Sequence, residues 1–334
     1  AYPGELAVFQ IRPDRGTDSG SVSVVAYGDG FLEGSTLRLV RSGQPDILGD
    51  PVSVGPNWRT ISTTLDLEGS ARGKWDVHIR DPAGDVVILA EAFTVEEEKT
   101  HVWVDILGRG AIRTGRPATF HIAYGNRGNV DAVAVPLWIS GIPLDAIWEL
   151  GFDIAPVTLS DGSTADGVET QPIALSIGDE LVIPLLIPVI PPEFSGTLEL
   201  NVTIQTSGDF ELRARTTSSF FGSPLEDEIV ECLEALLVTH AGLVPGGSCL
   251  AQAMINLKNT LGQRFLEESP YTPEPLSLTR VFFTMIRECG ELLLVSEAIQ
   301  AVWEVVNATV SGMGLGVECG EALVDVSDAM LPVT

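Results

Sequence analysis

The stretch from Thr114 to Pro143, in the middle of the chain, constrains the fold most narrowly. Phe120, Ile122 and Tyr124 alternate with polar or small residues, which is the pattern of a strand with one buried face. The segment Gly-Asn-Arg-Gly-Asn over residues 125–129 then predicts a turn, because Gly and Asn tolerate positive φ, and we expect Gly128 to adopt it. Alternation resumes from Val133 to Ile139. The stretch therefore predicts two strands joined by a polar turn inside an all-β module.

The first part of the chain predicts a β-sandwich of its own. Residues 5–95 contain about seven short apolar runs separated by turn signals. The segment Gly28-Asp29-Gly30-Phe31, followed by Gly34, Leu37 and Leu39, resembles the turn and strand of the IPT/TIG immunoglobulin-like modules of bacterial surface proteins. Residues 73–84 resemble the end of those modules, with Asp81 where asparagine is usual. The resemblance implies an Ig-like sandwich over residues 1–96 and names no ligand.

A second sandwich is expected over residues 100–221, after the charged link Glu96-Glu97-Glu98-Lys99-Thr100. The segments 113–117 and 120–129, with Pro136-Leu137, resemble the CARDB or DUF11 type of bacterial surface domain. The turn Asn126-Arg127-Gly128 matches the N-x-G turn of that family. We expect residues 142–171 to form a long irregular insert, which departs from the compact form of the family.

Composition changes after residue 222, and residues 223–334 are predicted to form a small helical bundle. Ile229, Cys232, Leu233 and Leu236 fall at helical spacing, and further helices are expected over 249–266, 278–307 and 318–330. All four cysteines lie in this tail: Cys232, Cys249, Cys289 and Cys319. An even number in one small subdomain favours two disulfides, with free buried thiols or a metal site as alternatives. Cys232–Cys249 and Cys289–Cys319 is the preferred pairing, although spacing alone does not determine connectivity.

Two groups of residues are candidates for ligand binding. The insert carries acids that are candidate calcium ligands, although no EF-hand pattern occurs and a solvated loop explains them as well: Asp153, Asp161, Asp166 and Glu169. Trp138 and Trp148 flank the insert and are the candidate pair for a sugar platform, with core packing as the stronger alternative. Calcium is therefore the one cofactor considered.

Charge excludes some classes of partner. The 334 residues carry a net charge of −27, and such a field repels nucleic acid and anionic lipid. The longest apolar run, residues 181–192, is shorter than the roughly 20 residues of a membrane span and contains several prolines, so no membrane insertion is expected. The opening Ala1-Tyr2-Pro3-Gly4 is what a processed chain or an excised fragment would show.

These observations favour a mainly β protein, secreted or at the cell surface, with two tandem Ig-like sandwiches and a C-terminal disulfide-tied helical domain. No nucleophile–base motif, phosphate loop or H-E-x-x-H is present, so no catalytic residue is assigned. The first hypothesis is a non-catalytic structural or interaction module that contacts itself or other surface proteins. The alternatives are a carbohydrate- or calcium-dependent binding protein and, third, a hydrolase whose site forms between domains.

Overall fold

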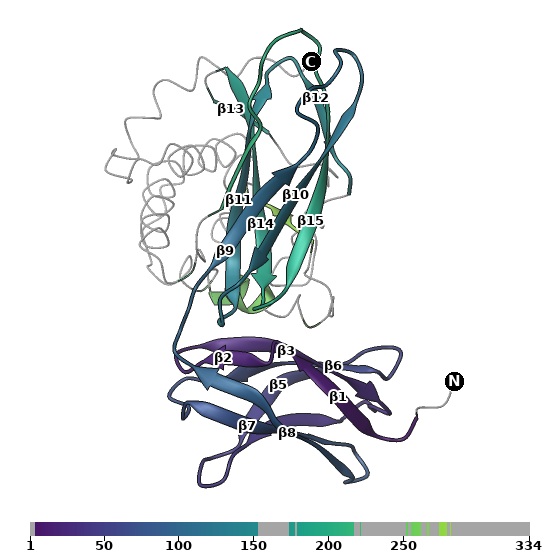
Figure 1. Ribbon diagram of the computed structural model, residues 1–334, viewed down its shortest axis with the longest axis vertical. Helices are drawn as coiled ribbons and strands as arrows, with labels where there is room; N and C mark the ends of the chain where they lie inside the picture. The colour runs from purple at the N-terminus through teal and green to yellow at the C-terminus, as the bar shows by residue number, and fades with distance from the viewer. Residues whose placement is uncertain are drawn as a thin grey trace.

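The structure is a computed structural model that describes residues 4–152, 174–177, 179–216, 221, 252, 255–261, 266, 274–278 and 281 (Figure 1). Its described strands are β1 Ala7–Arg12, β2 Arg15–Thr17, β3 Ser21–Asp29, β4 Thr36–Val40, β5 Ile47–Val54, β6 Thr60–Asp66, β7 Gly73–Arg80, β8 Val86–Glu96, β9 Val102–Leu107, β10 Ala118–Asn126, β11 Ala132–Pro143, β12 Ile147–Leu150, β13 Leu175–Ile177, β14 Glu180–Ile190, β15 Ser195–Thr203, β16 Arg213–Thr216 and β17 Leu276–Ser277. The prediction of a β-sandwich architecture is confirmed.

The first sandwich uses the strand order β1-β3-β6-β5-β4-β7-β8-β2. β5 joins the two layers, because it pairs with β4 through Ile47 and Leu48 and with β6 from Gly49 to Val54. The side chains that alternate in the sequence fill the space between the layers, with Trp75, Phe31 and Phe93 among the largest fully buried ones. The alternation of apolar and polar residues in the sequence therefore corresponds to one buried and one exposed face on each layer.

The second sandwich consists of the sheets β12-β15-β10-β9 and β13-β14-β11-β16, with β17 added to β14. β10 is central in its sheet: Ile122 is the register partner of Leu198 on β15 and of Ile106 on β9. The stretch expected to be an irregular insert from residue 142 is partly regular, since β11 continues to Pro143 and β12 pairs with β15. Residues 153–171 of that stretch lie outside the described residues.

β14 is buried on both faces from Val182 to Ile190, which explains its unbroken apolar sequence. The inner face contributes Ile183, Leu185 and Ile187 to the core of the second sandwich. Leu276 of β17 pairs with Leu186, so part of the C-terminal region adds a short strand to the second sandwich, directly before the predicted helix 278–307.

The tail is described at few positions. Residues 255–261 are helical, within the predicted helix 249–266, and Leu261 is buried. Most of the predicted helical domain, and all four cysteines, lie outside the described residues, so the bundle and its disulfides stay predictions. Among the helices that the structure describes, none has the length and apolar character needed to cross a bilayer.

Candidate functional site

The two sandwiches meet at the end of β10 and the turn that follows it, residues 125–131. In Figure 1 the second sandwich stands over the layer of the first that contains β3, with the linker running alongside. This turn lies in the stretch Thr114–Pro143, from which two strands joined by a polar turn are predicted. Three of its polar side chains, those of Asn126, Asn129 and Asp131, bind three different parts of the junction, and each is described below.

Asn126 ties the turn to the end of β14. Its Nδ2 donates to the carbonyl oxygens of Val130 at 2.7 Å and Ile190 at 2.9 Å, and its Oδ1 accepts from the N–H of Gly128 at 2.8 Å. The residue is 3% exposed. The side-chain Nδ2 and Oδ1 of Asn126 therefore both bond to backbone groups that are buried or part-buried. Without these bonds, the loss of water around those groups would destabilise the fold.

Asn129 captures the linker between the sandwiches. Its Oδ1 accepts from the N–H of Lys99 at 2.6 Å, its Nδ2 donates to the carbonyl of Glu97 at 2.7 Å, and its own N–H donates to the carbonyl of Lys99 at 2.9 Å. Arg127 adds a backbone bond to the carbonyl of His101 at 2.8 Å. The charged segment that the sequence marks as a boundary is thus held along the turn.

Gly128 is required for a reason other than the one predicted. It is absent from the glycines with positive φ, so the expectation of a left-handed conformation at this position is wrong. A Cβ atom built on Gly128 would lie 2.2 Å from the carbonyl oxygen of Lys99. The close approach of the linker backbone, which sequence does not reveal, is what excludes a side chain here.

Asp131 joins the turn to the first sandwich. Both of its carboxyl oxygens accept from the backbone N–H of Ser23, at 2.8 and 2.9 Å, and its own N–H donates to the carbonyl of Ser21 at 3.3 Å. β1 pairs with β3 only at Val25–Asp29, so Asp131 occupies the edge of β3 that β1 leaves open. The contact continues the hydrogen bonding of a sheet edge with a residue from another domain.

Burial perturbs the ionisation of Asp131. The residue as a whole is half-buried, but its carboxyl group is enclosed at the junction, and loss of water raises its pKa from 3.8 to about 6. The hydrogen bonds from Ser23 act in the opposite direction and lower the pKa, without cancelling the effect of burial. Among the residues that the structure describes, no Lys, Arg or His forms an ion pair with Asp131. Hydrogen bonds from Ser23 are therefore what stabilises its carboxylate.

Apolar contacts complete the junction. Val25 and Tyr27 of β3 pack in one cluster with Val133, Val189 and Phe194 of the second sandwich. Leu266 of the C-terminal region belongs to the same cluster and is 6% exposed. Three parts of the chain therefore bury apolar surface against one another here, which favours one fixed arrangement of the two sandwiches.

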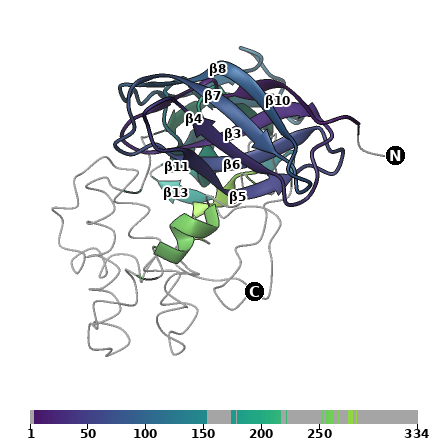
Figure 2. The same ribbon diagram turned by 90° about the horizontal axis from the view of Figure 1, so that it is seen from below.

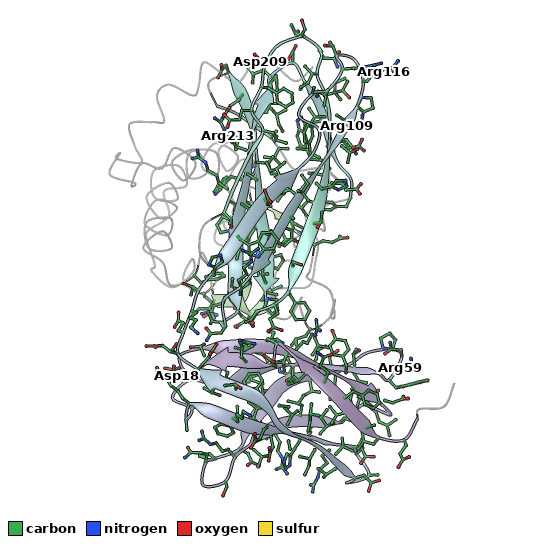
Figure 3. All side chains as sticks on the ribbon, viewed as in Figure 1. Asp18, Arg59, Arg109, Arg116, Asp209 and Arg213 are labelled. Carbon is green, nitrogen blue, oxygen red and sulfur yellow. The ribbon has the colours of Figure 1, made fainter. Side chains whose placement is uncertain are left out.

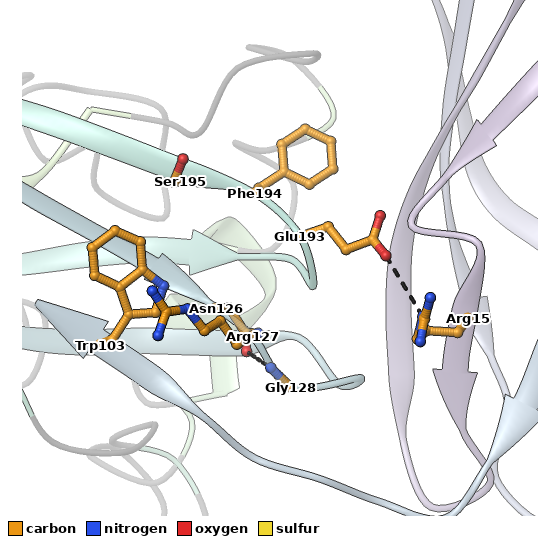
Figure 4. A pocket seen from close by; sticks show the side chains of 8 residues that line it. All are labelled: Arg15, Trp103, Asn126, Arg127, Gly128, Glu193, Phe194 and Ser195. Carbon is orange, nitrogen blue, oxygen red and sulfur yellow. Dashed lines mark hydrogen bonds and ion pairs between the residues drawn. The ribbon is translucent and has the colours of Figure 1, made fainter.

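A pocket of about 430 Å³ opens beside the junction (Figure 4). Arg15 of the first sandwich and Glu193 of the second face each other across it at 3.6 Å. The Arg127 guanidinium lies 4.9 Å from the ring centroid of Trp103, whose indole packs on Gly125 of the neighbouring strand. The eight residues that line the pocket include no histidine, cysteine or lysine. Its two arginines suit it to binding an anionic group rather than to proton transfer near neutral pH.

The candidate sugar-binding tryptophans do not share a face. Trp138 lies on β11 and is 6% exposed, while Trp148 lies on β12 of the other sheet and packs against the core of the second sandwich. The structure thus places the two indoles in different sheets, with neither forming an exposed platform with the other. This arrangement matches the alternative of core packing.

The other candidate ligands cannot be placed. Asp153, Asp161, Asp166 and Glu169, proposed for calcium, lie outside the described residues, as do Cys232, Cys249, Cys289 and Cys319. Within the described part of the chain, no group of three or more His, Cys, Asp or Glu side chains is arranged to hold a metal ion. Both candidate sets therefore stay predictions.

Asp131 is the residue that sequence reasoning missed. In the sequence it is a single acid between Val130 and Ala132, with the composition of an ordinary turn. Its role depends on the open edge of β3, more than 100 positions earlier in the chain, as the separation of 108 to Ser23 shows. The nearest available signal was the density of Asn and Asp over residues 126–131, which indicates a turn and does not indicate a partner.

Comparison with known proteins assigns no family. No family model matches the chain, and no curated protein matches it. Similar solved structures include a fragment described as domains C and D (12% identity, 65% of this chain and 100% of the other, TM-score 0.21) and bovine butyrophilin (7% identity, 65% and 96%, TM-score 0.18). A third was solved with a xylogluco-oligosaccharide (12% identity, 65% and 58%, TM-score 0.21). TM-scores this low carry no argument, so the resemblances to IPT/TIG and CARDB modules remain resemblances.

Proposed function

We propose that this protein is a non-catalytic structural or interaction module of the bacterial cell surface or exterior: a spacer, an adhesin segment or a subunit of a surface assembly. The observation that carries the proposal is the junction, where one turn binds the linker, the end of β14 and the open edge of β3. A hinge would leave the linker free, whereas a spacer or an assembly subunit benefits from sandwiches held at one angle. Function then consists of presenting surfaces at a set distance.

The pocket at the junction supports the same proposal. Four of its polar side chains have contacts inside the protein: Arg15 faces Glu193, Arg127 lies over Trp103, and Asn126 binds the turn. The Arg15–Glu193 contact joins the two sandwiches, the other two fix the turn within the second sandwich, and none of the three pairs a nucleophile with a base. We accordingly propose a contact function without a cofactor and without catalysis.

Self-association tests the proposal. The net charge of −27 opposes close approach of copies, so we expect association to strengthen as added salt or divalent cations screen the repulsion. Sedimentation velocity across a salt series measures this, with larger species appearing as ionic strength rises. A strict monomer at every ionic strength, combined with no larger species on native cells, would contradict the assembly form of the proposal and leave a passive spacer.

The compartment is tested separately through the cysteines. We propose that Cys232, Cys249, Cys289 and Cys319 form two intrachain disulfides, as suits an oxidising exterior. The intact mass of the native protein is then expected to fall about four hydrogens below that of the reduced protein, two for each bond. Alkylation of all four thiols in unreduced, denatured protein would contradict both the disulfides and this argument for an extracellular location.

A further inference from the structure

The pocket beside the junction presents a cationic group to which no protein oxygen is bonded. The guanidinium of Arg127 lies over the Trp103 ring, 4.9 Å from the ring centroid. Among the residues that the structure describes, no carboxylate forms an ion pair with this guanidinium and no oxygen accepts a hydrogen bond from it. Its N–H donors therefore remain available to a molecule that enters the pocket.

Trp103 holds this guanidinium in place. Trp103 lies on β9 and is the register partner of Gly125 on β10, and a Cβ atom built on Gly125 would lie 2.8 Å from the indole. The ring therefore packs directly on the strand backbone. The backbone of Arg127 is fixed as well, because its N–H donates to the carbonyl of His101 at 2.8 Å. A guanidinium stacked on a ring keeps the donors at its edge for a planar anion, and fixing it beforehand lowers the entropy lost on binding.

Glu193 is the acid among the lining residues, and its carboxylate is directed to Arg15 (Figure 4). Its backbone has a φ of +67°, a conformation that favours glycine, and its N–H donates to the carbonyl of Asn126 at 2.9 Å. Arg15 also bonds to Asp14 at 3.1 Å, but Asp14 lies outside the lining. The lining thus combines two arginines with one acid that is already paired, and Arg127 is its uncompensated charge.

The size and position of the pocket suit a small ligand. Its volume of about 430 Å³ falls within the roughly 300–1,000 Å³ that is usual for ligand pockets. Figure 2 looks along the long axis of the molecule and shows the first sandwich lying across the end of the second, in front of β10 and β11. Arg127 is exposed, so a ligand can reach it from solvent. The net charge of −27 repels anions at long range, but physiological salt screens that repulsion beyond about 8 Å.

We propose that this pocket binds the carboxylate of a small organic acid through paired hydrogen bonds from the Arg127 guanidinium. A carboxylate matches the planar donor pair of a guanidinium. One uncompensated positive charge suits a monoanion, whereas a phosphate dianion would bring a second negative charge near Glu193. Phe194 supplies apolar surface for the rest of the ligand. This site goes beyond the proposed contact function and does not depend on it.

An NMR titration of the full chain with benzoate tests the proposal, with benzamide as the neutral molecule of similar shape. The signal followed is the indole N–H of Trp103, identified by its loss in Trp103→Phe. Benzoate is expected to shift it saturably, and benzamide is not. Arg127→Gln should weaken benzoate binding at least about tenfold, and Glu193→Gln should tighten it about threefold by removing a like charge. Arg116→Gln is the matched control, because Arg116 lies at the far end of the second sandwich (Figure 3).

Thermal unfolding verifies that every variant folds as wild type does. Equal binding of benzoate and benzamide, or undiminished benzoate binding by Arg127→Gln, would overturn the role of Arg127. Tighter binding of inorganic phosphate than of benzoate would overturn the choice of a carboxylate. No saturable shift with either benzoate or acetate would overturn the site itself. Self-association is measured separately by sedimentation, so the site and the assembly proposal can each fail without the other.

Discussion

The free energy of unfolding of the Asn126→Ala variant is expected to be about 3 kcal/mol lower than that of wild type. The alanine leaves three backbone groups without their partner: the buried Ile190 carbonyl and Gly128 N–H, and the part-buried Val130 carbonyl. An unsatisfied buried polar group costs about 1–3 kcal/mol, and partial access of water to the new space reduces the sum. Calorimetry of the full chain measures the effect as a lower transition temperature.

Asn57→Ala provides the matched control for this effect. The Oδ1 of Asn57 also accepts a turn N–H, that of Arg59 at 3.0 Å, but the residue is exposed. Water replaces that bond after substitution, so a loss below about 1 kcal/mol is expected. A loss for Asn126→Ala no larger than for Asn57→Ala would show that the turn is dispensable for stability.

The Asp131→Asn variant is expected to change how stability depends on pH. The folded pKa of Asp131 is raised to about 6 from 3.8, so the folded protein binds the proton more tightly than the unfolded chain does. The stabilisation from that proton is complete below about pH 3.8 and is lost as pH rises through about 6. Wild type therefore loses stability from this group between about pH 4.5 and 7.5, by about 2 kcal/mol.

Asparagine removes the charge and retains an oxygen that accepts from the Ser23 N–H. The stability of the variant relative to wild type should therefore rise by about 2 kcal/mol between about pH 4.5 and 7.5, whatever constant offset its amide N–H groups add. Denaturant unfolding at several pH values measures the difference. Glu149→Gln makes the same change of charge at an exposed position of β12 and controls for net charge. If the difference in free energy of unfolding between Asp131→Asn and wild type did not vary with pH, the burial of the Asp131 carboxyl at the junction would be contradicted.

These two variants also probe different links of the junction. Asn126 holds the turn onto its own sandwich, whereas Asp131 reaches the first sandwich. If the protein works as a spacer, loss of the Asp131 contact should matter more for the relative position of the sandwiches than for either core. The cores themselves are separate clusters on either side of the junction.

Much of the β architecture could be predicted because its physical signal is local. Alternation at residues 120–124 and 75–79 reports one buried and one exposed face per strand, which depends only on neighbours along the chain. The turn at residues 125–129 was readable from Gly and Asn, although the reason for Gly128 was not. β14 was not predicted as a strand, because burial of both faces removes the alternation that reveals a strand.

By itself, the sequence determined the sandwich class, most strand positions of the first sandwich, the turn after β10 and an acidic surface that disfavours nucleic acid. Only the tertiary structure decided that Asp131 binds the edge of β3 and that the linker passes against Gly128. Strand periodicity depends on residues that are adjacent in the sequence, whereas these contacts join segments that are far apart in the sequence. Which edge stays open, and which backbone comes close, depends on how the two sandwiches pack.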